Sequence, residues 1–458
     1  MFNTMKKGLE TGEQKGAEYV ELRGEETHLT LLSYSDGRVD NLISKIRTGL
    51  ACRVLHNGAW GFTCGRGDDA STLVAEACSL AQAAAQHRKD KISLAEITPA
   101  QEETHKHYKT PPHEVSFEEK IGRLHSLYNE IKSYDKRIKA ISIKYSDSHG
   151  KKYLMTNEGT RITQETGHVW NYCWVTGKEN GTLTAARDEV GSSEQGYEFF
   201  ESQPAETIGT RIGKRVLLQL KGKTPKKGYF PCILGPRVVG VLAHEALGHL
   251  AEADLTLNSS FNGKLGKQVA SELVTMVDAP REGTFGGQKY DDEGVKMSRV
   301  DIIKDGIFSG MLTDREYAAR TQMPTCGAAR AESFLFPTLI RMRNTFFEPG
   351  DFTQEELFED IDFGYYCVDF RGGQAELNSS FQVGIQEGFE INDGKIGEPI
   401  KDLSISGIAT DSLHVIDGIG KTLGFEEGRC GKGQTAYISA GGPHIRVKKG
   451  GILFGGRD

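Results

Sequence analysis

The feature that most restricts the fold of this chain is an apolar stretch near its centre that ends in two histidines and a glutamate. Residues 235–249 read GPRVVGVLAHEALGH, in which proline precedes a run of valine, leucine and alanine. Proline at the first helical position followed by such residues predicts a buried helix. His244, Glu245 and His249 lie within it, and burying polar groups costs free energy unless a partner satisfies them. The rest of the fold must supply that partner.

The spacing of the two histidines restricts the helix further. His244 and His249 are five positions apart, and an α-helix turns by about 100° per residue, so their side chains would diverge by about 140°. An extra residue in the turn, as in a π-bulge, returns positions i and i+5 to one face, and such bulges gather at functional sites. Gly248 is well placed to permit this distortion. We therefore expect a distorted helix.

Two imidazoles and a carboxylate are the groups that a zinc peptidase needs, as metal ligands and as the base that takes a proton from water. The alternative is a pair of hydrogen-bonded core histidines, the usual state of an isolated histidine on an apolar face. Three such groups in one buried turn favour the metal site, because of the cost of desolvation. We predict His244 and His249 as ligands and Glu245 as the general base.

A catalytic zinc site that keeps an open position needs a third protein ligand. Glu252 and Asp254 follow the second histidine closely, whereas Cys430 lies far along the chain, between glycines in a segment expected to be a polar loop. Thiolate is a strong zinc ligand, and neighbouring glycines allow the backbone to approach closely. The residues alone leave the cysteine and the local acids as alternatives.

Length and turn signals indicate an α+β chain of several domains. A chain of 458 residues is too long for one ordinary core. Alternating and helical runs predict one α+β subdomain at 1–89 and another at 116–222, joined by a charged, solvated linker at 90–115. From 228 to 458, short strands broken by turns predict a β-rich barrel or sandwich that carries the metal-site helix.

Local signals place individual elements. Ser116 followed by Glu119 predicts a capping box at the start of a helix. Further helices are expected at 3–15, 70–86 and 202–220, and in the last half only near Pro236 and Thr353. The expected strands of the second subdomain are 140–147, 152–156 and 161–175. Turn signals are Asp36-Gly37, Asn57-Gly58, Asp305-Gly306, Asp393-Gly394 and Asp417-Gly418.

Charge and composition argue against several classes of protein. The formal net charge is -7 and no basic stripe is present, which disfavours direct binding of nucleic acid. No apolar run resembles a signal peptide or a membrane span, so we expect a cytoplasmic protein without membrane contact. The eight cysteines are scattered singly, without a C-x-x-C pair, and are expected to be reduced.

Five motifs in the C-terminal half resemble the TldD/PmbA metallopeptidases, a family also described as modulators of DNA gyrase, and in particular its catalytic TldD type. The N-terminal half matches more loosely, in domain layout rather than motifs. The motifs are HEALGHLAEAD at 244–254, VASEL at 269–273, YDDEG at 290–294, RGGQ at 371–374 and RCGK at 429–432.

The resemblance implies that His244, His249 and Cys430 bind one zinc ion per chain, with Glu245 as the catalytic acid and base. It implies hydrolysis of unfolded or small peptides, held as an added β-strand. It also implies a dimer, either with a second copy or with a related non-catalytic chain. Ala253 stands where many relatives have glycine, a change that leaves the ligands untouched.

Other motifs have simpler explanations beside the functional ones. Arg371, Gly372 and Gly373 could line the substrate groove, or form a β-bulge. The acids at 291–293 precede a glycine and are expected to form a turn rather than a metal site. The close spacing of His105, His107 and His113 in the charged linker is expected to be a matter of chance on a solvated loop rather than a binding site. The rival function is a metal-stabilised binding protein that regulates a partner, for example a topoisomerase, without hydrolysing anything.

Overall fold

A computed structural model describes residues 1–67 and 69–456 of the chain. Position 68 of the domain predicted at 1–89, and positions 457 and 458 of the domain predicted at 228–458, lie outside the described residues. The N-terminal half contains α1 (Phe2–Gln14), β1 (Tyr19–Ser35), β2 (Arg38–His56), β3 (Ala59–Gly65), α2 (Ala70–Ala85), β4 (Gln101–Thr104), η1 (Pro112–Glu114), α3 (Phe117–Tyr134), β5 (Ile138–Thr156), β6 (Arg161–Glu179), β7 (Thr182–Ser192), η2 (Tyr197–Glu201) and α4 (Ala205–Lys221).

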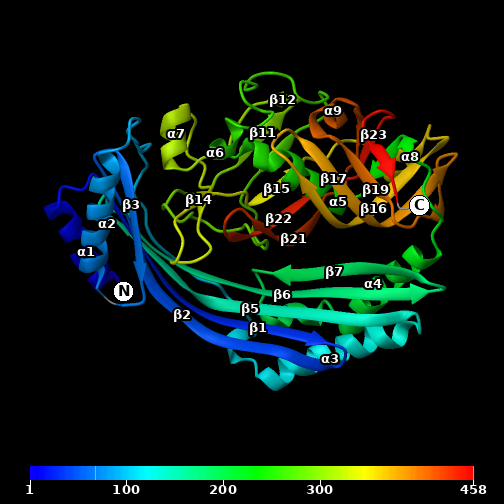
Figure 1. Cartoon of the computed structure of the whole chain (residues 1–458), viewed down its shortest axis with the longest axis horizontal. Coiled ribbons are helices and arrows are strands. Elements are labelled where there is room, and N and C mark those ends of the chain that lie inside the picture. The colour runs from blue at the N-terminus through cyan, green and yellow to red at the C-terminus, as the bar shows by residue number, and fades with distance from the viewer. Residues whose placement is uncertain (68, 457–458) are drawn as a thin grey trace.

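Strands from both predicted N-terminal subdomains form one curved sheet. Its order is β3-β2-β1-β5-β6-β4, and β7 also pairs with β6. Strands β1 and β5 join the two subdomains, from the pair Glu21 and Thr156 to the pair Ser35 and Ser142. Helices α3 and α4 cover one face of this sheet, and the C-terminal half lies across the other (Figure 1). The division at 90–115 stays a prediction about domains, although the sheet spans both sides of it.

Several local predictions in this half are confirmed. Asp36 and Gly37, and likewise Asn57 and Gly58, adopt positive φ between paired strands, the conformation that these residue types favour in tight hairpins. The Oγ atom of Ser116 accepts a hydrogen bond from the backbone of Glu119 at the start of α3, which confirms the N-cap but not the return bond from the Glu119 side chain that completes a capping box. Helices α1, α2 and α4 match the three predicted helices to within three residues at each end.

Two predictions in this half were wrong in detail. The expected strands 140–147 and 152–156 are one continuous strand, β5, because β1 and β6 pair with it on both sides through the intervening residues. The segment 90–115 is largely exposed or half-buried, as expected of a solvated connection, but it contributes a strand that was not expected, β4, whose residue Gln101 pairs in parallel with Arg161. Pairing between distant strands leaves no periodic signal within the segment itself.

The C-terminal half contains many short strands and two larger sheets. The sheet orders are β12-β11-β10-β15-β22-β21 and β20-β23-β9-β16-β17-β19-β24-β8, with β18 paired to β17. The elements are β8 (Gly228–Tyr229), β9 (Cys232–Leu234), α5 (Pro236–Val241), η3 (Leu242–Gly248), η4 (His249–Ala251), α6 (Ala253–Thr256), β10 (Met276–Asp278), β11 (Val300–Lys304), β12 (Ile307–Phe308), α7 (Arg315–Thr321), β13 (Ala329–Arg330), β14 (Leu339–Ile340), β15 (Asn344–Phe347), α8 (Gln354–Phe358), β16 (Phe363–Ala375), β17 (Ser380–Asn392), β18 (Lys395–Pro399), β19 (Ser404–Ile408), α9 (Ala409–His414), β20 (Ile416–Ile419), β21 (Gly424–Gly431), β22 (Thr435–Gly442), β23 (Ile445–Val447) and β24 (Leu453–Gly455).

The helical segment predicted from the apolar stretch lies in the core of this half. Val239 and Leu247 share one buried cluster with Ile303 of β11, Phe347 of β15 and Ile385 of β17, so both large sheets pack against α5 and η3. Burial of the apolar residues therefore fixes the segment in place, and its polar side chains are held with it. The predicted α+β class with a β-rich C-terminal half is confirmed.

Turn and helix predictions in this half met mixed outcomes. The Asp305-Gly306 and Asp393-Gly394 turns are confirmed by positive φ at all four residues. Asp417-Gly418 was wrong as a turn, because both residues lie within β20, where Asp417 accepts a hydrogen bond from Arg446. The helices expected near Pro236 and Thr353 are present as α5 and α8, but α6, α7 and α9 were not predicted.

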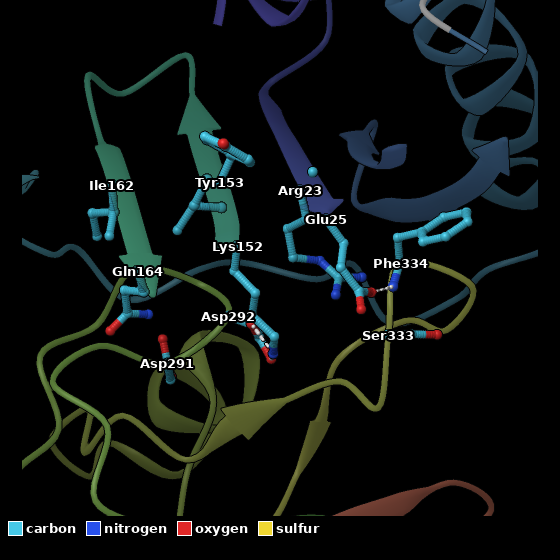
Figure 2. A pocket seen from close by; sticks show the side chains of 12 residues that line it. Arg23, Glu25, Lys152, Tyr153, Ile162, Gln164, Asp291, Asp292, Ser333 and Phe334 are labelled. Atoms are coloured by element: carbon cyan, nitrogen blue, oxygen red, sulfur yellow. Dashed lines mark hydrogen bonds and ion pairs between the residues drawn. The ribbon is translucent and has the colours of Figure 1, made fainter. Parts of the chain in front are cut away.

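Charged side chains join the N-terminal sheet to loops of the C-terminal half. Lys152 of β5 forms an ion pair with Asp292 at 2.9 Å, and Glu25 of β1 accepts a hydrogen bond from the backbone of Phe334 (Figure 2). The backbone N–H of Gly294 donates to the carbonyl oxygen of Asp291, and the Asp291 side chain accepts a hydrogen bond from the backbone of Glu293, which confirms the turn expected at 291–294. None of the helices in the described part of the chain has the length and hydropathy that a membrane span requires.

Candidate metal centre

The segment that carries the predicted ligands changes its helical pitch at the site. Helix α5 passes into η3, a π-helix over Leu242–Gly248, which confirms the expected distortion. A π-helical turn holds about one more residue than an α-helical turn, so residues five apart fall on one face. The ring centroids of His244 and His249 accordingly lie 5.1 Å apart.

Gly248 is required here for a steric reason. Its φ is −61°, an ordinary helical value that any residue adopts. A Cβ atom at this position, however, would lie 2.1 Å from the Sδ atom of Met342 and 3.0 Å from the carbonyl oxygen of Ala243. The glycine therefore permits the distorted helix, as expected, and it does so by leaving room for Met342 and for the carbonyl of Ala243.

Cys430 lies beside the two histidines. Its Sγ atom is 3.4 Å from Nε2 of His249, and one possible ligand atom from each of His244, His249 and Cys430 lies within 4.8 Å of the others. Cys430 belongs to the edge strand β21 rather than to a loop, which corrects that expectation. A Cβ atom at Gly431 would meet nothing within 4 Å, so close approach of the backbone does not explain that glycine.

The acids that were alternative ligands have other partners. Glu252 is fully buried, and its Oε2 atom lies 2.8 Å from Nδ1 of His249, the ring nitrogen that faces away from Cys430. Lys432 contacts both Glu252, at 3.1 Å, and Asp254, at 2.7 Å. A carboxylate on one ring nitrogen orients the imidazole and leaves the other nitrogen free to bind a metal.

His244 is buried without a hydrogen-bond partner. The residue is 4% exposed, and among the described residues neither of its ring nitrogens has a partner. Burial, followed by His249 and Arg341, lowers the pKa of His244 well below its usual value, so the ring is neutral. A buried polar atom without a partner costs about 1–3 kcal/mol, and this argues against a hydrogen-bonded core histidine.

Glu245 faces a cavity of about 320 Å³, which we call the metal-site cavity. His244 lines the same cavity, and the Oε2 atom of Glu245 lies 3.9 Å from Nε2 of His249. Burial raises the pKa of Glu245 above its usual value, with a smaller raising effect from Glu252 and an opposing one from His249. A carboxylate of raised pKa beside a metal site suits proton transfer near neutral pH.

The residues predicted to bind substrate also line the metal-site cavity. Arg371, Gly372 and Gly373 lie on β16 and border it together with Glu245. The register of β16 against β17 shifts between Phe370 and Gly372, so the β-bulge that was the alternative explanation is present as well. Arg371 donates a hydrogen bond to the carbonyl oxygen of Ala185 in β7, 3.1 Å away.

Several charged residues of the metal-site cavity were not anticipated from the sequence. They come from β7, α5 and β21, and they are Arg187, Glu189, Arg237, Glu426, Glu427 and Arg429. A sequence signal existed for the first two, because Arg187, Asp188 and Glu189 are consecutive charges in the middle of an otherwise weakly polar strand. Such charges are buried only when they are paired.

Sequence comparison decides the family. Residues 20–86, 110–220 and 227–452 match the sequence models of domain 1, the central domain and the C-terminal domain of PmbA/TldA metallopeptidases. The chain belongs to the PmbA/TldD metallopeptidase family. The resemblance drawn from the motifs is thereby confirmed.

Full-length relatives support the TldD type. The zinc metalloprotease TldD homolog of Saccharolobus solfataricus is 35% identical over 452 residues, which cover 98% of each chain. A metalloprotease of Methanocaldococcus jannaschii is 35% identical over 454 residues, covering 97% of this chain and 98% of the relative. This PmbA/TldD family member is an enzyme, a metallopeptidase.

Solved structures share its fold over nearly the whole length. A candidate modulator of DNA gyrase from Thermotoga maritima superposes with a TM-score of 0.78 at 20% identity, covering 99% of both chains. TldE from Thermococcus kodakarensis gives 0.77 at 18% identity, covering 99% of this chain and 100% of the other. At such identities the likeness concerns the fold alone.

Proposed function

We propose that this metallopeptidase hydrolyses unfolded or small peptides with one zinc ion per chain, held by His244, His249 and Cys430. The observation that carries the proposal is the buried His244 ring, whose nitrogens have no partner among the described residues, beside a thiol and a second imidazole. Two neutral nitrogens and a thiolate form a donor set that suits zinc, a borderline-soft cation. The residues present therefore fit zinc, the metal that the name of the Saccharolobus solfataricus relative states.

Glu245 is proposed as the general base and acid. A bound zinc ion would polarise the scissile carbonyl and make the attacking water more acidic. Glu245 faces the cavity from the same turn as the ligands, so it would accept the proton of that water and deliver it to the leaving amine. Glu252 would hold the ring of His249 in the tautomer that leaves Nε2 free.

The rival proposal is a metal-stabilised binding protein without hydrolysis. A structural zinc site fills all four positions with protein ligands, whereas the group that converges here within the described residues has three. A partly buried carboxylate that faces a cavity next to those ligands has no function in a structural site. Both features favour the peptidase.

The shape of the site supports an extended peptide as substrate. Strand β21 ends its sheet and pairs only with β22 among the described strands, so its free edge could pair with a peptide backbone. Pairing of this kind gives affinity through main-chain hydrogen bonds and little selection among side chains. Arg371, Gly372 and Gly373 border the same cavity and are proposed to contact the substrate.

The partner chain and the compartment are also proposals. We propose a dimer with a second copy or with a related non-catalytic chain, and a chain named TldE shares this fold. We place the enzyme in the cytoplasm, because its eight cysteines are free thiols, as is usual in a reducing compartment.

Metal analysis combined with a cleavage assay tests the peptidase proposal. The purified chain should contain about one zinc ion and cleave an unstructured peptide much faster than a folded protein. Chelation should abolish cleavage, and added zinc should restore it. Cleavage that survives complete removal of the metal would contradict the proposal, and full zinc loading without cleavage of any unstructured peptide would favour the binding protein.

A further inference from the structure

A second cavity borders the metal site on the side of the N-terminal sheet. It measures about 360 Å³ and lies between strands β1, β2, β5 and β6 and the C-terminal half. Arg429 lines both this second cavity and the metal-site cavity. Since Arg429 directly precedes Cys430 in β21, a peptide that extends past the metal ligands along this strand reaches the second cavity.

Arg429 places a positive charge where the two cavities meet, and this charge is not used in an ion pair within the described residues. Its guanidinium group lies 3.8 Å from the centroid of the Trp170 ring. Among the described residues, no carboxylate forms an ion pair with it. Stacking on an aromatic ring holds a guanidinium in position while leaving its N–H groups free to bind a carboxylate.

Arg330 brings a second positive charge to the cavity, and this one is buried. The residue is 7% exposed and donates hydrogen bonds to the carbonyl oxygens of Met342, at 2.9 Å, and Tyr437, at 2.6 Å. Burial, followed by Arg341, lowers its pKa to about 10, so it stays charged at neutral pH. Asp292 and Asp278 oppose this lowering, but no carboxylate among the described residues forms an ion pair with Arg330. A buried charge outside an ion pair is costly, and an anionic ligand would offset that cost.

Arg330 and Arg429 are held near one another by Tyr437. Arg330 donates to the carbonyl oxygen of Tyr437, and Tyr437 is the strand partner of Arg429 across β21 and β22. The ring of His168 lies against that of Tyr437, with centroids 4.2 Å apart. The cavity thus combines cationic groups with aromatic surfaces.

The positive charge of this region acts on His168. Burial, followed by Arg429 and Arg47 in the same direction, lowers the pKa of His168 to about 3. His168 is therefore neutral, with its two ring nitrogens hydrogen-bonded to Ser146 and Ser148. It adds no charge at any physiological pH, so the field in the cavity comes from the arginines.

The acids of the cavity are engaged elsewhere. Glu25 pairs with Arg47 at 2.6 Å, and Glu165 pairs with Lys151 at 3.2 Å. Glu332 accepts a hydrogen bond from the backbone of Thr435. None of these contacts neutralises the arginines at the junction of the two cavities.

We propose that the second cavity binds a carboxylate of the peptide substrate while the scissile bond lies at the metal site. This inference rests on the proposed peptidase function. Planar arginine groups match the geometry of a carboxylate, and the aromatic surfaces of Tyr437 and His168 suit the apolar part of the residue that carries it. The carboxylate comes either from the C-terminus of the peptide or from an aspartate or glutamate side chain, and both present the same group.

Binding of labelled peptides to the Glu245→Ala variant tests the inference without cleavage. Three forms of one unstructured octapeptide are compared by fluorescence anisotropy: a free C-terminus with neutral side chains, the same peptide amidated, and the amidated peptide with one aspartate. Charge-assisted hydrogen bonds to a carboxylate should make at least one carboxylate form bind about tenfold more tightly than the neutral form. Preference for the first form assigns the terminal carboxylate, and preference for the third assigns the side chain. Equal affinity of all three forms would overturn the inference.

Arginine variants locate the preference in the second cavity. Arg429→Gln and Arg330→Gln, each combined with Glu245→Ala, should reduce the preference at least about fivefold and weaken its dependence on salt. Arg38→Gln, which removes an exposed arginine of β2 whose side chain is 84% exposed, is the matched control and should leave the preference unchanged. Because Arg429 adjoins Cys430, zinc content is measured in every variant, and Arg330→Gln decides if Arg429→Gln loses metal. A preference unchanged in Arg330→Gln and in a zinc-loaded Arg429→Gln would overturn the inference.

The outcomes separate this inference from the peptidase proposal. Cleavage of all three peptides at equal kcat/KM, with equal binding, would contradict the carboxylate cavity and leave the peptidase intact. A carboxylate preference in binding, together with a wild-type enzyme that cleaves no peptide, would contradict the peptidase alone.

Discussion

His249 directs its Nε2 atom at the Sγ atom of Cys430, 3.4 Å away, although 181 residues separate the two in the sequence. The contact joins a π-helical turn to the edge strand of a sheet, and neither element forms the site alone. The C-terminal half must fold before the three proposed ligands converge. A metal bound there would in turn stabilise the folded state by mass action.

Replacing Glu245 should separate metal binding from catalysis. In Glu245→Ala the three proposed ligands are untouched, so zinc content should remain at the wild-type level. Loss of the general base should lower kcat at least about a hundredfold. Metal analysis and cleavage of an unstructured peptide, carried out on the same preparation, check both results. Unchanged cleavage by the variant would contradict the proposed mechanism.

Replacing the proposed third ligand, Cys430, should reduce zinc binding more than replacing Glu252, the residue that orients His249. Cys430→Ser exchanges a thiolate for a poor zinc ligand and should lose most of the metal. Glu252→Gln keeps a hydrogen-bond acceptor for Nδ1 of His249 and should weaken zinc binding by about 10- to 100-fold without abolishing it. Competition with a chelator measures both. Full occupancy in Cys430→Ser together with metal loss in Glu252→Gln would assign the third ligand to Glu252 instead.

Gly248→Ala should disturb the π-helical turn through packing. The added methyl group would lie 2.1 Å from Sδ of Met342, and overpacking of this kind costs about 1–3 kcal/mol. Gly122→Ala in α3 is the matched control, because a Cβ there meets nothing within 4 Å and alanine favours a helix by up to about 1 kcal/mol. Denaturant unfolding of the two variants should therefore show changes of opposite sign. Equal effects would contradict the steric explanation of Gly248.

Asp188 should be essential for the stability of the fold where β7, α4 and α5 pack together. It is buried and forms ion pairs with Arg215 at 2.8 Å, Arg211 at 2.6 Å and Arg237 at 3.5 Å, the last in the first turn of α5. Removing one member of a buried ion-pair cluster typically costs about 3–5 kcal/mol, because its partners stay buried without compensation. Asp188→Asn should lower Tm clearly in calorimetry, whereas Asp40→Asn, at a largely exposed pair, should not.

Because of Glu427, the free energy of unfolding should decrease as the pH rises. Burial raises its pKa from the usual 4.5 to about 7, with smaller contributions from Glu189 and Glu426 in the same direction. Between these values the folded chain holds a proton that the unfolded chain has released, so unfolding becomes easier as the pH rises through about 7. The effect amounts to at most about 3 kcal/mol. Urea unfolding at pH 5 and pH 8 should show a smaller difference in Glu427→Gln than in the wild type, and an identical difference in both would contradict this role.

Predictions from the sequence succeeded where the deciding contacts are local. Proline before an apolar run located α5, and the five-residue spacing of His244 and His249 indicated the π-helical turn. Positive φ at Asp36 and Asp305 follows from turn preferences of single residues. In each case, residues close together in the sequence determine the conformation.

The failures share a different cause. Asp417-Gly418 has the composition of a turn but lies in a strand, since its aspartate is paired with Arg446, 29 residues further along. The residues alone left Cys430 and Glu252 as equal candidates for the third ligand, and the resemblance to a family was needed to choose between them. Pairing between distant segments decided these points, and no local pattern records it.

The amino-acid sequence by itself determined the local chemistry of this protein: a buried helix with two histidines and a glutamate, a distortion that brings the histidines to one face, and the motifs of a metallopeptidase family. Tertiary structure alone decided that Cys430 approaches Nε2 of His249. It also decided that Arg429 and Arg330 both line a second cavity. These arrangements depend on strand pairing across more than a hundred residues, which is set by burial of the whole core rather than by neighbours in the sequence.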